Sequence, residues 1–119
     1  MNKELYEETQ KRLIKPVSVN EAEQLIHSMP QLEILDGRNI ENYQQGHIEG
    51  AQLIDAFSPD AGSRLLELDK NIPYLVYCTT NVRSTMIVRF MHDQGFKEVY
   101  HMVEGMVGWI EHQKDTVSS

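Results

Sequence analysis

The 119-residue sequence predicts an α/β sandwich, in which helices cover both faces of a mostly parallel sheet. Two observations lead to this prediction. Short apolar runs between turn residues alternate along the chain with segments of helical periodicity, which is the pattern of consecutive β-α-β units. The strongest strand signal, residues 74–78 (YLVYC), lies inside this alternating series and reads as a central strand of the sheet.

Length and composition are those of one soluble globular domain. Of the residues, 40% are hydrophobic and 24% are charged, and the formal net charge is −7. An acidic chain without a basic cluster argues against nucleic-acid binding. Residues 1–8 contain no apolar stretch typical of a signal peptide, and no apolar run is long enough to span a membrane. We therefore expect a cytoplasmic protein, by default a monomer, with no membrane partner.

The N-terminal segment, residues 1–15, is charged and helix-prone, and Pro16 ends any helix within it. We expect an extension to the domain there, either helical or frayed. Asn20 and Glu23 match a capping box, and the apolar stripe that follows predicts a helix running up to Pro30.

The remaining elements follow from local pattern. Strands are predicted where short apolar or β-branched runs lie between turn residues, at 32–36, 51–54, 74–78 and 98–102. Helices are predicted from apolar spacing and from start and stop signals, at 40–45, 58–68, 84–94 and 107–113. The apolar face of the helix at 84–94 is expected to consist of Met86, Ile87, Phe90 and Met91. The domain is predicted to span 16–115, with a disordered tail at 116–119.

Cys78 is the single cysteine of the chain, so neither an internal disulfide nor a four-cysteine metal site can form. It lies at the carboxyl end of the strand at 74–78, and ligands bind beyond this end of the strands in parallel sheets. A lone cysteine in a strand is more often an inert core residue, so the residues after Cys78 decide its interpretation.

The segment CTTNVRS, residues 78–84, joins this strand to the next predicted helix. The N–H groups of such a loop and the positive end of the helix favour an anion, and they lower the pKa of a thiol held there. Arg83 adds a permanent positive charge, Asn81 enters the left-handed backbone region at low cost, and hydroxyl groups add further donors. The candidate nucleophile is therefore Cys78, and the candidate substrate-binding loop is Thr79, Thr80, Asn81, Val82, Arg83 and Ser84.

The same residues allow a plainer interpretation, a core strand followed by an ordinary strand-to-helix loop. Cys78 would then be inert, and Ser84 would only cap the helix. The loop by itself leaves both interpretations open.

Further motifs extend the analysis upstream and downstream of the loop. Residues 36–38 (DGR) match the pattern D-x-R at a strand end, and residues 41–51 (ENYQQGHIEGA) closely match E-x-Y-x-x-G-H-I-x-G-A. Residues 95–100 match G-F-x-x-V-Y, and residues 104–109 are similar to G-G-x-x-x-W, with Glu104 in place of the first glycine.

With the loop pattern C-x-x-G-x-R-S, in which Asn81 replaces the glycine, these motifs resemble the rhodanese, or sulfurtransferase, homology domain over residues 17–113. The resemblance implies a rhodanese-like three-layer sandwich with a mostly parallel, five-stranded sheet. It also implies that Cys78 takes a sulfane sulfur, as a persulfide, from a donor such as thiosulfate or a protein persulfide.

No second cysteine can resolve this persulfide within the chain, so the acceptor is expected to be external: cyanide, a small thiol or the cysteine of a partner protein. No cofactor is implied. A metal site is not expected, because the histidines show no ligand spacing with carboxylates.

Two other functions remain open. Phosphatases with a cysteine cradle have five residues between cysteine and arginine, whereas this loop has four, residues 79–82, and a smaller ring of amides suits a single sulfur atom. A rhodanese-like binding or regulatory module without efficient turnover is the stronger alternative. The residue after Cys78 is Thr79 rather than a basic residue, and the net charge of −7 gives an anionic donor little help. We therefore predict weak use of thiosulfate.

Other polar residues in the motifs are interpreted as structural. His47 is expected to tie the turn after Gly46 to the fold, and Asp36 and Arg38 to anchor one another or nearby backbone. Trp109 is expected in the core or the pocket wall.

Overall fold

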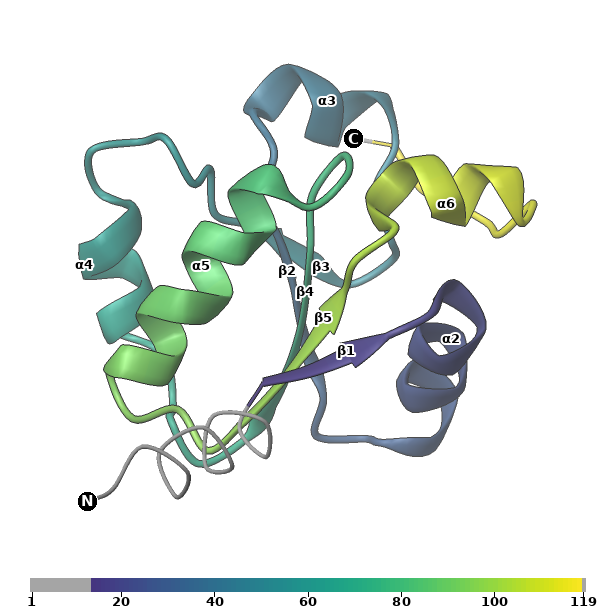
Figure 1. Ribbon diagram of the computed structural model, residues 1–119. Helices are drawn as coiled ribbons and strands as arrows, with labels where there is room; N and C mark the ends of the chain where they lie inside the picture. Colours follow the sequence, from purple (N-terminus) through teal and green to yellow (C-terminus); the bar gives the residue numbers. More distant parts are fainter. Residues whose placement is uncertain (1–13, 119) are drawn as a thin grey trace.

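The computed structural model describes residues 14–118 and contains a five-stranded sheet between two layers of helices (Figure 1). The strands are β1 (Ile14–Val17), β2 (Glu33–Asp36), β3 (Ala51–Leu53), β4 (Pro73–Tyr77) and β5 (Glu98–Met102). The helices are α2 (Val19–Ser28), α3 (Ile40–Gln45), α4 (Ala61–Leu66), α5 (Val82–Asp93) and α6 (Gly105–Glu111). Within the described residues, no helix is long and apolar enough to cross a membrane.

The strand order is β1-β5-β4-β2-β3, and every pairing is parallel. Alternate side chains of a strand point to opposite faces, so the sheet has two cores. Leu75 of β4 packs with Val19 and Trp109 on the face covered by α2 and α6. Val76 packs with Ile87 on the face covered by α4 and α5, which lie together on the other side of the sheet in Figure 1. The predicted α/β sandwich is confirmed, and β4 is its central strand.

Helix α2 begins earlier than the sequence pattern predicts. The capping box consists of Ser18 and Glu21 rather than Asn20 and Glu23. Ser18 Oγ accepts a hydrogen bond from the Glu21 amide at 3.1 Å, and the Glu21 carboxylate accepts one from the Ser18 amide at 2.9 Å. The hydrogen bonds with the backbone and side chain of Ser18 lower the pKa of the Glu21 carboxyl. The two candidate boxes overlap in the sequence, and Val19, fully buried at the first helical position, favours the earlier one.

Strand β1 was not among the predicted strands. It pairs with β5, with Ile14 opposite Val99 and Val17 opposite Met102. Its sequence, IKPV, is short and contains a proline, which occurs in strands chiefly at a sheet edge, where its missing N–H is not needed. Most of the predicted extension, residues 1–13, lies outside the described part of the chain.

The C-terminal segment differs from the predicted disordered tail. Val117 forms an antiparallel bridge with His47, in which each amide donates to the other's carbonyl, at 2.9 and 2.8 Å. Trp109 Nε1 also donates to the Asp115 carbonyl at 2.9 Å. A single bridge between distant segments has no periodic signal in the sequence, so local pattern could not predict it.

Helix α5 begins at Val82, two residues before the predicted start at Ser84. Its buried face contains Ser84, Ile87, Val88 and Met91, which follow the i, i+3, i+4, i+7 spacing. Met86, predicted on the apolar face, is 49% exposed. The earlier start matters because it places the first turn of α5 directly beside Cys78.

Candidate active site

Cys78 follows the last residue of β4 and directs its sulfur atom at the first turn of α5. Its Sγ accepts a hydrogen bond from the Ser84 amide at 3.3 Å and contacts Ser84 Oγ at 3.2 Å. The Cys78 side chain is 2% exposed. The sulfur is therefore buried, yet it meets polar donors rather than only apolar side chains.

The sulfur atom replaces the usual side-chain oxygen as the cap of α5. Asn81 occupies the N-cap position, but its side chain makes no cap hydrogen bond and donates instead to the Val103 carbonyl at 3.4 Å. The Val82 and Arg83 amides of the first turn have no hydrogen-bond partner among the described residues. Unpaired N–H groups and the positive end of a 12-residue helix favour a negative charge at this point.

The loop is held from behind by the start of α6. The Met106 amide donates to the Cys78 carbonyl at 2.8 Å, and the Val107 amide donates to the Thr79 carbonyl at 3.1 Å. A trans peptide directs its N–H opposite to its C=O, so the Thr79 and Thr80 N–H groups point away from α6. Gly105 allows this approach: a Cβ there would lie 2.4–2.7 Å from the carbonyl oxygens of residues 78–80.

Arg83 lies at the rim and is partly engaged elsewhere. Its guanidinium carbon lies 4.2 Å from the centre of the Phe57 ring, and Nη1 lies 3.5 Å from Asp55 Oδ1. Nη1 is sealed from solvent and makes no hydrogen bond to a described residue. Arg83 thus retains an unsatisfied donor, while Asp55 offsets part of its charge.

Together these residues border a pocket of about 210 Å³. It is lined by Phe57, Cys78, Thr79, Thr80, Val82 and Arg83. The structure therefore brings five of the seven predicted site residues to one cavity. Ser84 lies behind the sulfur and is fully buried, and Asn81 is turned toward Val103.

Two details of the predicted loop are wrong. Asn81 has φ −145°, which is outside the left-handed region, so no glycine-like conformation is needed at this position. The positive φ occurs instead at Gly105, +65°, where the chain passes beneath the loop. Among the described residues Cys78 Sγ accepts a hydrogen bond from the Ser84 amide and donates one to Ser84 Oγ, and neither threonine hydroxyl adds another.

His101 is a site residue that the sequence analysis missed. Its Nε2 lies 2.7 Å from Ser84 Oγ, and burial lowers its pKa. Histidine spacing along the sequence gave no sign of it. The signal is the parallel register: His101 pairs with Val76 on the neighbouring strand, two residues before Cys78.

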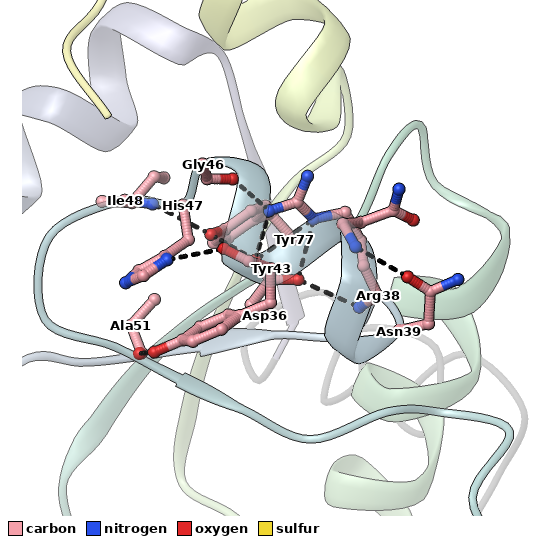
Figure 2. A network of polar contacts seen from close by, with 10 residues as sticks. Asp36, Arg38, Asn39, Tyr43, Gly46, His47, Ile48, Ala51 and Tyr77 are labelled. Carbon is pink, nitrogen blue, oxygen red and sulfur yellow. Dashed lines mark hydrogen bonds and ion pairs between the residues drawn. The ribbon is translucent and has the colours of Figure 1, made fainter. Parts of the chain in front are cut away.

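A buried polar network supports the adjacent strand end (Figure 2). Asp36 accepts hydrogen bonds from the Arg38 guanidinium, at 2.8–3.2 Å, and from the Tyr77 hydroxyl at 2.6 Å. Arg38 also donates to the Gly46 carbonyl at 2.6 Å, and Tyr77 accepts from the Ile48 amide at 3.1 Å. The predicted anchoring of Asp36 and Arg38 is confirmed, and the network joins β2, β4 and the turn before β3.

His47 belongs to the same scaffold. Its ring stacks on Tyr43, with the ring centres 3.8 Å apart, and Nδ1 lies 2.8 Å from the Tyr43 carbonyl (Figure 2). Its predicted structural role in the turn after Gly46 is confirmed.

Comparison with known proteins gives the same fold. The family model of the rhodanese-like domain matches residues 18–112. The match covers most of the chain, so the chain belongs to the rhodanese-like domain family.

Curated relatives cover similar stretches of the chain. The thiosulfate sulfurtransferase GlpE of Coxiella burnetii is 31% identical over 100 residues, which cover 84% of this chain and 91% of GlpE. YrkF of Bacillus subtilis, described as a candidate sulfur carrier protein, is 36% identical over 96 residues, which cover 81% of this chain. The matched region is 51% of YrkF, so the chain spans about half the length of that relative.

Solved structures show the same architecture. A rhodanese-like domain protein from Staphylococcus aureus superposes with a TM-score of 0.75 at 23% identity, covering 88% of this chain and 98% of that one. The rhodanese-like domain of Alr3790 from Anabaena superposes with a TM-score of 0.77 at 23% identity, covering 87% and 79%. At this level of identity the likeness establishes the fold.

Proposed function

We propose that the protein is a sulfurtransferase that carries a sulfane sulfur as a persulfide on Cys78. The observation that carries this proposal is the position of Sγ, which accepts the Ser84 amide at the N-terminus of α5 and borders an open pocket. Helix N-termini stabilise the thiolate, which is the nucleophilic form of cysteine. Membership of the rhodanese-like family and the relative named thiosulfate sulfurtransferase support the same chemistry.

Two half-reactions account for the transfer. The Cys78 thiolate attacks the outer sulfur of thiosulfate, the S–S bond of the donor breaks, and sulfite leaves with the bonding electron pair. An acceptor thiolate or cyanide then attacks the outer sulfur of the Cys78 persulfide. The new bond gives the acceptor's persulfide or thiocyanate, and Cys78 returns as a thiolate. One covalent intermediate shared by two substrates predicts ping-pong kinetics.

The pocket rim favours an organic persulfide over thiosulfate as the donor. Phe57 is 58% exposed and Val82 is 66% exposed, so the mouth of the pocket presents apolar surface. Arg83 shares its charge with Asp55, and the net charge of the chain is −7, so a small dianion gains little electrostatic attraction. A persulfide on a small thiol or on a partner protein can use the apolar rim as well.

A second function, a rhodanese-like module that binds a partner without turnover, is favoured by the burial of the sulfur. Cys78 is 2% exposed, so a donor reaches Sγ only through the pocket. A module of this kind would keep the fold and the pocket but transfer no sulfur.

A transfer assay distinguishes these functions. Wild type and Cys78→Ser are each given thiosulfate or glutathione persulfide, with cyanide as acceptor, and thiocyanate is measured. We expect ping-pong kinetics in the wild type, a larger kcat/KM with glutathione persulfide, and loss of catalysis in Cys78→Ser. Equal rates of thiocyanate formation in the two proteins would exclude transfer through Cys78 and favour the binding module. Hydrolysis of an aryl phosphate that outpaces sulfur transfer would indicate a phosphatase instead.

A further inference from the structure

Three buried polar groups contact one another in succession behind the pocket. Cys78 Sγ lies 3.2 Å from Ser84 Oγ, which in turn lies 2.7 Å from Nε2 of His101. The exposed fractions of these residues are 2%, 0% and 6%. His101 is thus linked to the sulfur through a single hydroxyl group, and neither transfer step described above uses it.

The fold brings these groups together from three elements. His101 lies on β5 opposite Val76 of β4, and the two side chains point to the same face of the sheet. Cys78, two residues after Val76, continues that face, which is the one covered by α5. Ser84, in the first turn of α5, lies between the sulfur and the imidazole.

The Ser84 hydroxyl has one hydrogen and two neighbours, and this sets the direction of the hydrogen bonds. With Cys78 as a thiol, S–H donates to Oγ, and the hydroxyl donates to a bare Nε2. With Cys78 ionised, the sulfur is only an acceptor, so the hydroxyl stabilises it by donating to Sγ. Oγ is then free to accept from His101, which requires a hydrogen on Nε2.

We propose that His101 is a positioning residue for Cys78: its Nε2–H donates to Ser84 Oγ and keeps the Ser84 hydroxyl hydrogen on the ionised sulfur. The sulfur then has two donors, the amide and the hydroxyl of Ser84. In the persulfide, both donors still contact the inner sulfur, which is Cys78 Sγ. Negative charge returns to this atom when the acceptor attacks the outer sulfur. The catalytic purpose of this contact from His101 through Ser84 rests on the proposed function, but its physical effect is on the acidity of the Cys78 thiol.

The surroundings of the imidazole agree with a neutral ring that has its hydrogen on Nε2. Nδ1 makes no hydrogen bond to a described residue, so no described acceptor holds the ring hydrogen on Nδ1. Burial lowers the pKa of His101, which disfavours the imidazolium form. Arg83, the cation of the loop, is turned to Asp55 and Phe57.

The test follows the acidity of Cys78. Because the chain has one cysteine, alkylation by iodoacetamide reports on this thiol alone. The pH profile of alkylation is measured for wild type, Ser84→Ala, His101→Leu and the double variant, with His101→Gln as the matched control that keeps an amide N–H in reach of Oγ. We expect Ser84→Ala and His101→Leu to raise the apparent pKa by about one pH unit each, the double variant by no more, and His101→Gln to stay near wild type.

A second measurement needs no variant. ¹⁵N NMR of the wild-type imidazole, at a pH where the thiol is ionised, should show the neutral ring with hydrogen on Nε2. An Nδ1–H ring, or a folded His101→Leu with wild-type acidity of Cys78, overturns the proposal. If the variants raise the apparent pKa of Cys78 but the wild type transfers no sulfur, the proposed function is wrong and the positioning role of His101 stands. If the wild type transfers sulfur but the variants do not change this pKa, the positioning role is wrong and the proposed function stands.

Discussion

The charge of Arg83 is divided between the pocket and Asp55, which lies 3.5 Å from its guanidinium. Nη1 itself is sealed from solvent, but the two side chains are 29% and 31% exposed and the pair is 3.5 Å long, so the ion pair is partly screened and weak. The aromatic face of Phe57, 4.2 Å away, holds the guanidinium by a second contact that does not neutralise it. Asp55 therefore reduces the field at the pocket without removing Arg83 from the rim.

Removal of the Asp55 charge should improve the use of an anionic donor. In Asp55→Asn we expect KM for thiosulfate to fall roughly two- to five-fold, the range that an exposed ion pair supports, with little change in kcat. Arg83→Gln should raise KM for thiosulfate. Arg83→Lys, which keeps the charge, should have a KM between those of wild type and Arg83→Gln. Steady-state kinetics at low and high salt check this, since the gain should shrink as salt increases. An unchanged KM in Asp55→Asn would mean that Arg83 does not act on the donor.

At the scale of elements, the candidate site depends on the contact between the start of α6 and the loop after β4. Gly105 has φ +65° and lies so close to the loop that a Cβ would meet three carbonyl oxygens, of residues 78–80, at 2.4–2.7 Å. Real Cβ atoms do not approach backbone this closely, so a side chain there must push the loop and α6 apart. The amide donors of Met106 and Val107 would move with it.

Gly105→Ala should therefore destabilise the fold and impair the site together. We expect a loss of several kcal/mol in the free energy of unfolding, above the ~1–2 kcal/mol that left-handed geometry alone costs a residue with a side chain. Gly95→Ala is the matched control, because Gly95 has φ +88° with nothing within 4 Å of a built Cβ. Urea unfolding and alkylation of Cys78 are measured on both variants.

Gly95→Ala should lose only the stability that left-handed backbone geometry costs a residue with a side chain, and its Cys78 should be alkylated as in the wild type. Equal losses of stability in Gly105→Ala and Gly95→Ala would contradict the close contact between α6 and the loop.

The elements differ in how much of them local pattern could predict. Strand β4 and the cysteine that follows it were found because YLVYC is a continuous apolar run that ends in turn residues. Strand β1 was missed because an edge strand of four residues with a proline carries little local signal. The motif residues of the loop were found, but not the geometry of Asn81 and Gly105, which is set by contact between segments about 25 residues apart along the chain.

At the scale of the whole molecule, the position of His101 also could not be predicted from local sequence pattern. Its contact with Ser84 depends on the register of β5 beside β4 and on the placement of α5 over both strands. None of these is visible in the spacing of histidines. The side chain is buried within the layer between the sheet and α5, so its ionisation is coupled to folding as well as to the site.

The stability of the protein should therefore fall in mild acid. Burial lowers the pKa of His101, so the folded chain binds a proton there less readily than the unfolded chain, whose histidine pKa is ~6.5. The contribution is present above pH ~6.5 and is lost as pH falls toward the folded pKa. Glu21 and Glu23, whose pKa values are lowered by hydrogen bonds to Ser18 and Lys114, act in a separate window at lower pH.

Urea unfolding of wild type and His101→Gln on both sides of pH ~6.5 checks this assignment. The wild type should lose stability on going to the lower pH, and His101→Gln should lose less. A decrease of the same size in both proteins would place the responsible group elsewhere in the chain.

The central claim is that the sulfur capping α5 carries a second sulfur. The most direct test is the intact mass of the protein after brief treatment with glutathione persulfide and removal of the donor, without reductant. The account predicts a gain of one sulfur atom, localised to Cys78 by fragmentation, absent in Cys78→Ser and reversed by cyanide. An unchanged mass in the folded wild type, under conditions where iodoacetamide alkylates the same thiol, would contradict it.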